Sequence, residues 1–167
     1  SQDIDEIIKL KNNQPNTLGD FAVNVSAERF KKEKFTLRTV MTSAFILMLA
    51  RYNPLNFIDG SSIGLDSKLR ECNRKEFHHL MPKAFLRDSG QNVYNENCLA
   101  NFCFISRANN RLLGGDMPSL YQARMTGDIP AIIQSHQIPS SLFSDDFQRF
   151  VDERAELLET ISRELCA

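Results

Sequence analysis

Two adjacent histidines, His78 and His79, are the residues of this 167-residue chain whose type and spacing best suit chemistry. An imidazole can bind a metal ion, and its reference pKa of about 6.5 lets it accept a proton at neutral pH. In an extended segment, successive side chains point to opposite faces, so neighbouring histidines can take different roles. One could hold a metal ion while the other faces a substrate water molecule.

Short apolar segments predict the elements that would position these histidines. The histidine pair lies in an apolar run, 77–81, that Pro82 ends, which indicates a first strand. Residues 102–105 are apolar and rich in strand formers, which predicts a second strand. Ser106 fits the N-cap of a short helix, 107–113, that Gly114 and Gly115 end. The expected order is therefore strand, long loop, strand, helix.

His78-His79, Asn101 and Asn110, taken in this order, resemble the three-part signature of the HNH endonucleases. Eight residues separate the two asparagines, which is the spacing of the family pattern. The flanking segments 79–82, 99–102, 110–114 and 117–121 also resemble the nuclease half of GmrSD-type proteins. That family includes modification-dependent type IV restriction enzymes and phage-defence nucleases. The resemblance covers about residues 70 to 125 and implies a ββα-metal finger.

The resemblance also implies a role for each residue of the signature. His78 and Asn110 would hold one divalent metal ion, Mg²⁺, and Mn²⁺, Co²⁺ or Ni²⁺ should also be accepted. His79 would be the general base that activates the attacking water. The Asn101 side chain would brace the loop so that the His79 ring keeps its orientation. An amide in place of a third-position histidine implies a weak, exchangeable metal site.

The distribution of charge favours a phosphate-binding role for the central segment. Net charge over the whole chain is −1, but residues 68–124 carry 9 basic and 5 acidic side chains, whereas residues 125–167 carry 3 and 8. Lys83, Arg107 and Arg111 are the candidate DNA contacts, since arginine suits bidentate phosphate recognition. A four-charge excess is too small to imply tight autonomous DNA binding.

Composition bounds the remaining possibilities. Neither a signal peptide nor an apolar run long enough to cross a bilayer is evident, so a cytoplasmic location without membrane association is expected. The four cysteines form no CxxC pair, which argues against a structural zinc knuckle. The apolar neighbours of Cys98 and Cys103 instead favour buried free thiols. Because the first residue is Ser1 rather than Met, the chain is expected to be a fragment of a longer protein.

The rest of the chain predicts a helical surround. A helix over 36–52, capped by Thr36, should turn Val40, Ala44, Leu47 and Met48 inward as the core helix. A last helix should begin after a Ser144 or Asp145 cap, with apolar residues at helical spacing. The expected fold class is α+β and mainly helical, with the finger embedded in a single domain, 1–167. Its parts would be a helical N-terminal part (1–69), the metal core (70–125) and C-terminal helices (126–167).

These patterns together predict a metal-dependent HNH endonuclease that cuts or nicks DNA. It would be the effector domain of a restriction or anti-phage defence protein, whose N-terminal sensor and NTPase domain is missing from this chain. RNA cleavage shares this chemistry and stays open. The alternative from another class is a non-catalytic interaction module that keeps the finger fold. Asn109 is expected on the helix surface, and His136, Tyr121 and Phe85 are expected to serve packing.

Overall fold

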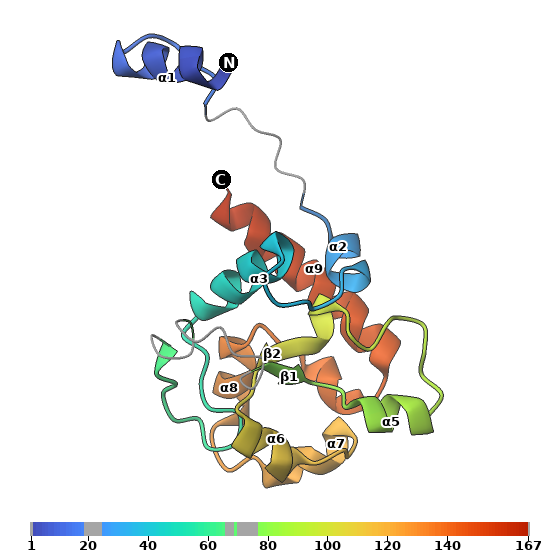
Figure 1. Cartoon of the computed structure of the whole chain (residues 1–167). Helices are drawn as coiled ribbons and strands as arrows, with labels where there is room; N and C mark the ends of the chain where they lie inside the picture. Colours follow the sequence, from blue (N-terminus) through green and yellow to red (C-terminus); the bar gives the residue numbers. More distant parts are fainter. Residues whose placement is uncertain (1, 19–24, 66–68, 70–76, 167) are drawn as a thin grey trace.

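The computed structural model describes residues 2–18, 25–65, 69 and 77–166. The protein has an α+β fold, mainly helical, and its described part contains one two-stranded antiparallel sheet (Figure 1). In chain order the elements are α1 (Gln2–Lys11), α2 (Ala27–Lys32), α3 (Val40–Ala50), β1 (Phe77–His79), α5 (Lys83–Asp88), η2 (Leu99–Asn101), β2 (Phe102–Phe104), α6 (Arg107–Leu113), α7 (Pro118–Tyr121), η3 (Gln122–Arg124), α8 (Ile129–Ser135), η4 (Ser140–Ser144) and α9 (Phe147–Leu165).

The two strands and the helix that follows them confirm the expected order of strand, strand and helix, but the segment between the strands, expected to be a loop, contains α5 and η2. The Ser106 side chain caps α6 by accepting a hydrogen bond from the Asn109 backbone N–H at 3.1 Å. Gly114 ends the helix at φ +70°, a backbone conformation that a side chain would disfavour. The strand pairs are Phe77 with Phe104, His78 with Cys103, and His79 with Phe102.

A row of aromatic rings covers one face of the sheet. The Phe35 ring stacks on Phe102 with centroids 4.2 Å apart, and the His79 ring contacts Phe102 at the same centroid distance. Beyond Phe35, the ring of Phe45 follows at 6.4 Å and that of Phe30 at 6.3 Å from Phe45. His79 is therefore one end of a row of rings that continues to α2 and α3.

Helix α3 differs from its prediction in both its start and its inward side. The cap is Thr39, whose hydroxyl accepts from the Thr42 backbone N–H at 3.2 Å, rather than Thr36. Val40 and Leu47, expected in the core, have exposed fractions of 87% and 62%, and Ala44 is exposed as well. The buried side is made of Thr42, Phe45, Ile46, Met48, Leu49 and Ala50. Because the helix is apolar nearly all round, its periodicity could not indicate which side faces inward.

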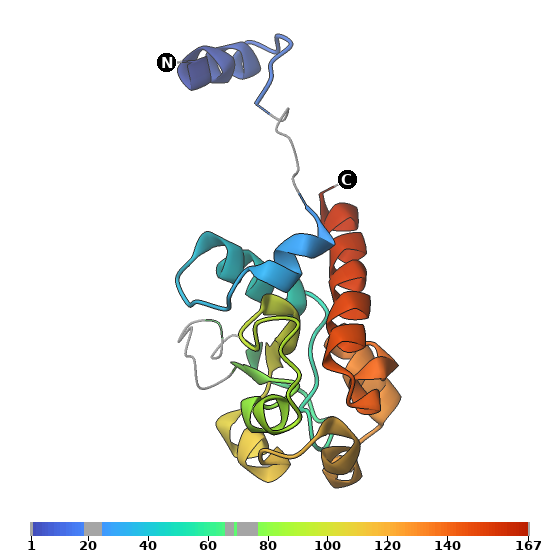
Figure 2. The same cartoon turned by 90° about the vertical axis from the view of Figure 1, so that its right-hand side faces the viewer.

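Helix α9 runs along one side of the molecule, with α2 beside it in both views (Figures 1 and 2). Its N-cap is Asp146, one residue beyond the later of the two predicted caps, Ser144 and Asp145, and the Asp146 side chain accepts from the Arg149 backbone N–H. The buried side carries the apolar stripe expected from the sequence, but Leu165 at its end is 42% exposed. No helix in the described ranges is both long and apolar enough to span a membrane.

A fully buried arginine of α9, Arg154, joins this helix to the second strand. Its Nη1 donates to the carbonyl oxygens of Ala100 at 2.7 Å and Phe102 at 2.9 Å. Its Nη2 donates to the His136 carbonyl and its Nε to the Gln137 carbonyl, each at 3.1 Å. Burial lowers the pKa of Arg154 to about 10, so the guanidinium keeps its charge at neutral pH. Within the described residues it has no carboxylate partner.

Replacing this guanidinium should destabilise the fold. Arg154→Met leaves four buried carbonyl oxygens without the donor that they bond in the native protein. Each buried acceptor left unpaired lowers the free energy of unfolding by about 1–3 kcal/mol, and removal of the buried charge offsets part of this loss. We expect urea unfolding to show a net loss of about 2 kcal/mol or more. Arg149→Met is the matched control, because Arg149 lies on the same helix but makes an exposed ion pair with Glu153. Equal losses in the two variants would contradict the role of Arg154.

Candidate functional site

The two adjacent histidines lie on β1, where the strand directs them to opposite faces. His79 faces the aromatic row through its contact with Phe102, and His78 is aligned with the buried Cys103. Both imidazoles are half-buried. Because side chains alternate along a strand, the pair has the two separate environments that a division of roles requires.

The side chain of Asn101 holds the turn that follows His79. Its Oδ1 accepts from the Met81 backbone N–H at 2.9 Å, and its Nδ2 donates to the Met81 carbonyl at 3.1 Å and to the Glu96 carbonyl at 2.9 Å. Its own carbonyl accepts from the Leu80 backbone N–H at 2.8 Å. Asn101 is fully buried, so these bonds replace its contacts with water. One side chain thereby connects the end of β1, the long loop and the start of β2.

A second asparagine, Asn97, sets the tautomer of His79. Its Oδ1 lies 3.2 Å from His79 Nε2, while its Nδ2 donates to Glu96 Oε1 at 3.2 Å. With the amide oriented in this way, His79 Nε2 carries the hydrogen, and the lone pair of the neutral ring is on Nδ1. The pKa of His79 is lowered to about 4, mainly by burial; the bond to Asn97 opposes this shift, and the nearby charge of Lys83 adds to it. The ring is therefore uncharged at neutral pH.

Helix α6 lies against β1 and carries the two neighbouring asparagines. Asn110, the predicted metal ligand, is half-buried. Asn109 was expected on the helix surface, but it is only 7% exposed, and its Nδ2 donates to Asn56 Oδ1 at 2.7 Å. The prediction for Asn109 was therefore wrong, because a loop distant in sequence supplies its partner. Asn109, Asn56 and Ser106 line a small cavity of about 170 Å³ beside this helix.

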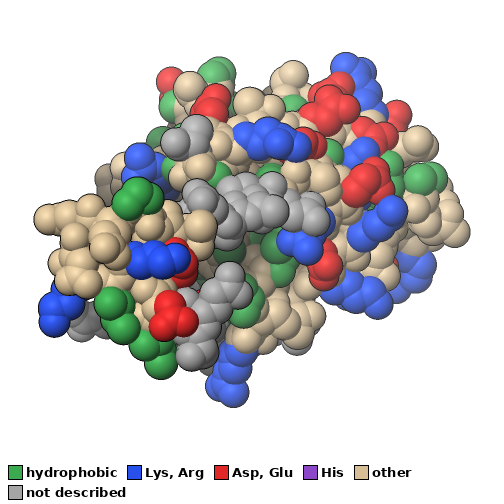
Figure 3. Space-filling model, turned by 90° about the horizontal axis from the view of Figure 1, so that it is seen from above, with side chains coloured by type: hydrophobic (Ala, Val, Ile, Leu, Met, Phe, Trp, Pro, Cys, Tyr) green, Lys and Arg blue, Asp and Glu red, His purple; other side chains and the backbone are tan. Residues whose placement is uncertain are grey.

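The predicted DNA contacts differ in their surroundings. Arg107 and Arg111 are exposed on α6 and form no ion pair with a described residue, whereas the Lys83 ammonium lies 3.2 Å from a carboxylate oxygen of Glu96. The face shown in Figure 3 is at the other end of the molecule. There, basic and acidic side chains are interspersed, and no histidine is visible. The exposed arginines lie on α6, the helix that contacts the strand carrying the histidines.

The donor set at this place fits only a weakly held metal ion. No group of three or more His, Cys, Asp or Glu side chains that could hold a metal occurs among the described residues. His78 and Asn110 would contribute one imidazole nitrogen and one amide oxygen, leaving the other positions to water and phosphate oxygens. Such a set suits a divalent ion that keeps much of its hydration shell. It does not suit a closed structural zinc site, which takes four protein ligands.

The two buried cysteines, Cys98 and Cys103, are not in a position to bind metal or catalyse. Cys98 and Cys103 are free and fully buried, which confirms the expectation of buried thiols. Burial raises the pKa of Cys98 to about 11 and that of Cys103 to about 12, so neither forms a thiolate at neutral pH. Cys166 is free and exposed at the end of α9, and Cys72 lies outside the described residues.

His136 and Tyr121 are structural, as expected. His136 is fully buried, with Nε2 2.7 Å from the Leu55 carbonyl and its ring against Phe57. This bond assigns the hydrogen to Nε2, and the buried Nδ1 has no partner among the described residues. The Tyr121 hydroxyl donates to the Leu80 carbonyl at 2.9 Å, next to the turn that Asn101 holds.

Two residues of the site were missed in the sequence, and only one of them had a signal. Arg154 occupies a position within the apolar stripe of α9, four residues after Phe150 and four before Leu158. A charged residue at such a position indicates a buried role. Asn97 lies in a polar loop among other asparagines, and nothing in its local sequence distinguishes it.

Comparison with known proteins identifies no homologue of this chain. No family model matches the sequence, and the curated proteins and the solved structures likewise yield no match. The interpretation of the site therefore depends on the residues themselves and on their geometry.

The buried histidines should make stability depend on pH. Burial lowers the pKa of both His136 and His79 to about 4, below the value of about 6.5 expected in the unfolded chain. Between these values the unfolded state binds protons that the folded state does not, so the unfolding free energy falls as the pH is lowered. We expect the urea midpoint to decrease from about pH 7 to about pH 5, where carboxylates are still largely ionised. A constant midpoint over this range would contradict the burial of neutral imidazoles.

Proposed function

We propose that this chain is a metal-dependent HNH endonuclease domain that hydrolyses or nicks DNA. The observation that carries the proposal is the buried Asn101 side chain, which closes the turn directly after His79. A bracing asparagine at this place is what the resemblance to the HNH signature implies. The antiparallel β1–β2 pair followed by α6 supports a ββα-metal finger.

His79 is the general base of the proposed reaction. Its Nδ1 has the lone pair that can accept a proton from water, while Asn97 holds the Nε2 hydrogen. The contact with Phe102 restricts the ring, and Asn101 fixes the backbone of the next two residues. A base held in one tautomer and one orientation loses little entropy when it acts, which is how such bracing contributes to rate.

His78 on β1 and Asn110 on α6 are the proposed metal ligands. A bound Mg²⁺ would supply charge neutralisation at the scissile phosphate. Mn²⁺, Co²⁺ or Ni²⁺ should replace it, because the proposed set mixes nitrogen and oxygen donors. The contact between α6 and β1 supports this pairing of ligands from the two elements.

Arg107, Arg111 and Lys83 are the proposed phosphate contacts. The two arginines are exposed on α6; Arg111 directly follows Asn110 in the sequence, and Arg107 comes three residues before it. Lys83 would have to break its ion pair with Glu96 in order to bind a phosphate. The pair is exposed, and exposed ion pairs are weak enough to break at little cost in free energy. These few cations support modest, salt-sensitive DNA binding rather than tight binding.

The resemblance to GmrSD-type proteins supports a role as the effector domain of a restriction or anti-phage defence protein in the cytoplasm. In that setting an N-terminal sensor and NTPase domain of the same polypeptide would select the DNA. A second candidate function is a non-catalytic interaction module. The exposed apolar side chains of α3, Val40 and Leu47, favour a docking role, which is compatible with catalysis at the other site.

Removal of the base should abolish cleavage without loss of the fold. We expect nicking of supercoiled plasmid with Mg²⁺ or Mn²⁺, none with EDTA, and a rate about 10²–10⁴ lower in His79→Ala. Circular dichroism and Mn²⁺ calorimetry provide the controls: His79→Ala should keep both the fold and metal binding, whereas His78→Ala should lose metal binding. Undiminished cleavage by His79→Ala would refute the assignment. Absence of both cleavage and Mn²⁺ binding in the unaltered chain would favour the interaction module.

The exposed arginines of α6 should determine the salt dependence of DNA binding. Each phosphate contact removed lowers the slope of log affinity against log salt by about 1 for duplex DNA, so Arg107→Ala with Arg111→Ala should lower it by about 2. Fluorescence anisotropy of a labelled duplex at several salt concentrations measures this slope. Arg149→Ala, an exposed arginine of α9, is the control and should leave the slope unchanged. Equal slopes in all variants would show that α6 does not contact phosphate.

A further inference from the structure

Helix α1 has an apolar side that it does not bury. Ile4, Ile7 and Ile8 are 58%, 54% and 50% exposed. Their spacing of three and four residues places them on one side of the helix. In both views α1 lies apart from the other helices (Figures 1 and 2). A helix of ten residues is marginal in water without packing, so this side is expected to have a partner.

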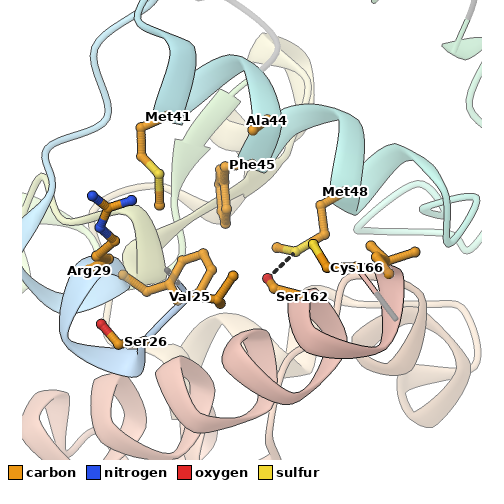
Figure 4. A pocket seen from close by; sticks show the side chains of 11 residues that line it. Val25, Ser26, Arg29, Met41, Ala44, Phe45, Met48, Ser162 and Cys166 are labelled. Atoms are coloured by element: carbon orange, nitrogen blue, oxygen red, sulfur yellow. Dashed lines mark hydrogen bonds between the residues drawn. The ribbon is translucent and has the colours of Figure 1, made fainter. Parts of the chain in front are cut away.

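An apolar groove lies at the end of the molecule nearest α1. It has a volume of about 230 Å³ and is formed by α2 with the residues before it, α3 and the C-terminal end of α9. Figure 4 shows Met41, Phe45 and Met48 of α3 facing Ser162 of α9 and Cys166, which follows this helix, across this space. The only hydrogen bond drawn across it joins the Ser162 hydroxyl to the Met48 sulfur.

The apolar surface continues from the groove onto the outer side of α3. Ala44 lines the groove and is exposed, and Val40 and Leu47, near it on the same side of the helix, are the exposed residues noted above. A helix that is apolar all round is normally covered on all sides. The groove and this side of α3 therefore form one surface that suits a short apolar helix.

We propose that the groove receives α1 of a second copy of this chain. Both surfaces belong to the same chain, so two copies can cover each other reciprocally about a two-fold axis. α1 stands apart from its own groove, where a second copy can reach it (Figure 1). The proposal does not depend on nuclease activity.

Charge supports a protein partner of this kind. Asp3 and Asp5 flank the isoleucine side of α1, and Arg29 lies exposed at the groove without an ion pair to any described residue. The acidic first turn of α1 and Arg29 at the groove edge are complementary, whereas the last turn of α1 carries Lys9 and Lys11. Helix α1 carries three acidic residues against two lysines, so it does not suit an anionic lipid surface, which attracts helices rich in lysine and arginine.

Sedimentation equilibrium tests the proposal directly. The unaltered chain should dimerise with increasing concentration, and Ile4→Asp with Ile7→Asp should raise the dimer dissociation constant about tenfold or more. Lys9→Asp is the matched control, because Lys9 lies on the other side of α1, where it pairs with Glu6. A chain that stays monomeric at every concentration, or equal weakening by the control, would overturn the proposal.

A disulfide trap identifies the occupant of the groove. In a Cys72→Ser background, Ile8→Cys should oxidise with the exposed Cys166 to give a covalent dimer, whereas Lys9→Cys should not. Cys98 and Cys103 are buried and do not compete. A disulfide within one chain would show that α1 binds its own groove and would overturn the proposal. As a further check, Arg29→Glu should weaken the dimer, and Asp3→Arg with Asp5→Arg should restore it.

Discussion

The candidate site depends on the hydrogen bonds that the buried guanidinium of Arg154 donates to backbone carbonyls. It is a buried charge whose desolvation is offset by carbonyl dipoles rather than by a carboxylate. Lysine could not replace it, because an ammonium has three donors on a single nitrogen, whereas Arg154 bonds four carbonyl oxygens from three separate nitrogens. Two of these oxygens, those of Ala100 and Phe102, flank Asn101 in sequence. Helix α9 therefore fixes the backbone on both sides of Asn101, and this positions the Asn101 side chain to bond the turn after His79.

This arrangement separates a rigid interior from an accessible edge. His79 is restricted by Phe102, by Asn97 and by the backbone that Asn101 holds, all of which come from the loop and strand that follow it. The arginines of α6, in contrast, are exposed and free to rearrange. A hydrolase requires a fixed base, whereas phosphate contacts on a flexible polymer tolerate mobile side chains. The distribution of burial across this small region matches those two requirements.

Local signals were sufficient to predict the strands, α6 and its caps, because Ser106, Gly114 and the apolar segments act on their immediate neighbours. Two aspects of the fold could not be predicted in this way. Thr36 and Thr39 both suit the cap of α3, and only the bond to the Thr42 backbone N–H distinguishes them. Asn109 and its neighbour Asn110 differ by one step of the helix, and the partner that buries Asn109 lies more than fifty residues earlier in the chain. Contacts between distant segments decided both the inward side of α3 and the role of Arg154.

The aromatic row gives the groove and the candidate base a common boundary. Phe30 and Phe45 line the groove, and the row continues through Phe35 and Phe102 to the His79 ring. Close-packed rings have little free volume, so a displacement of one is passed to the next rather than absorbed. A ligand of the groove that displaces Phe45 would thus displace the His79 imidazole through the rings of Phe35 and Phe102, by steric contact alone. The orientation of the His79 ring, the proposed base, is therefore coupled to the surface of the groove at the opposite end of the row.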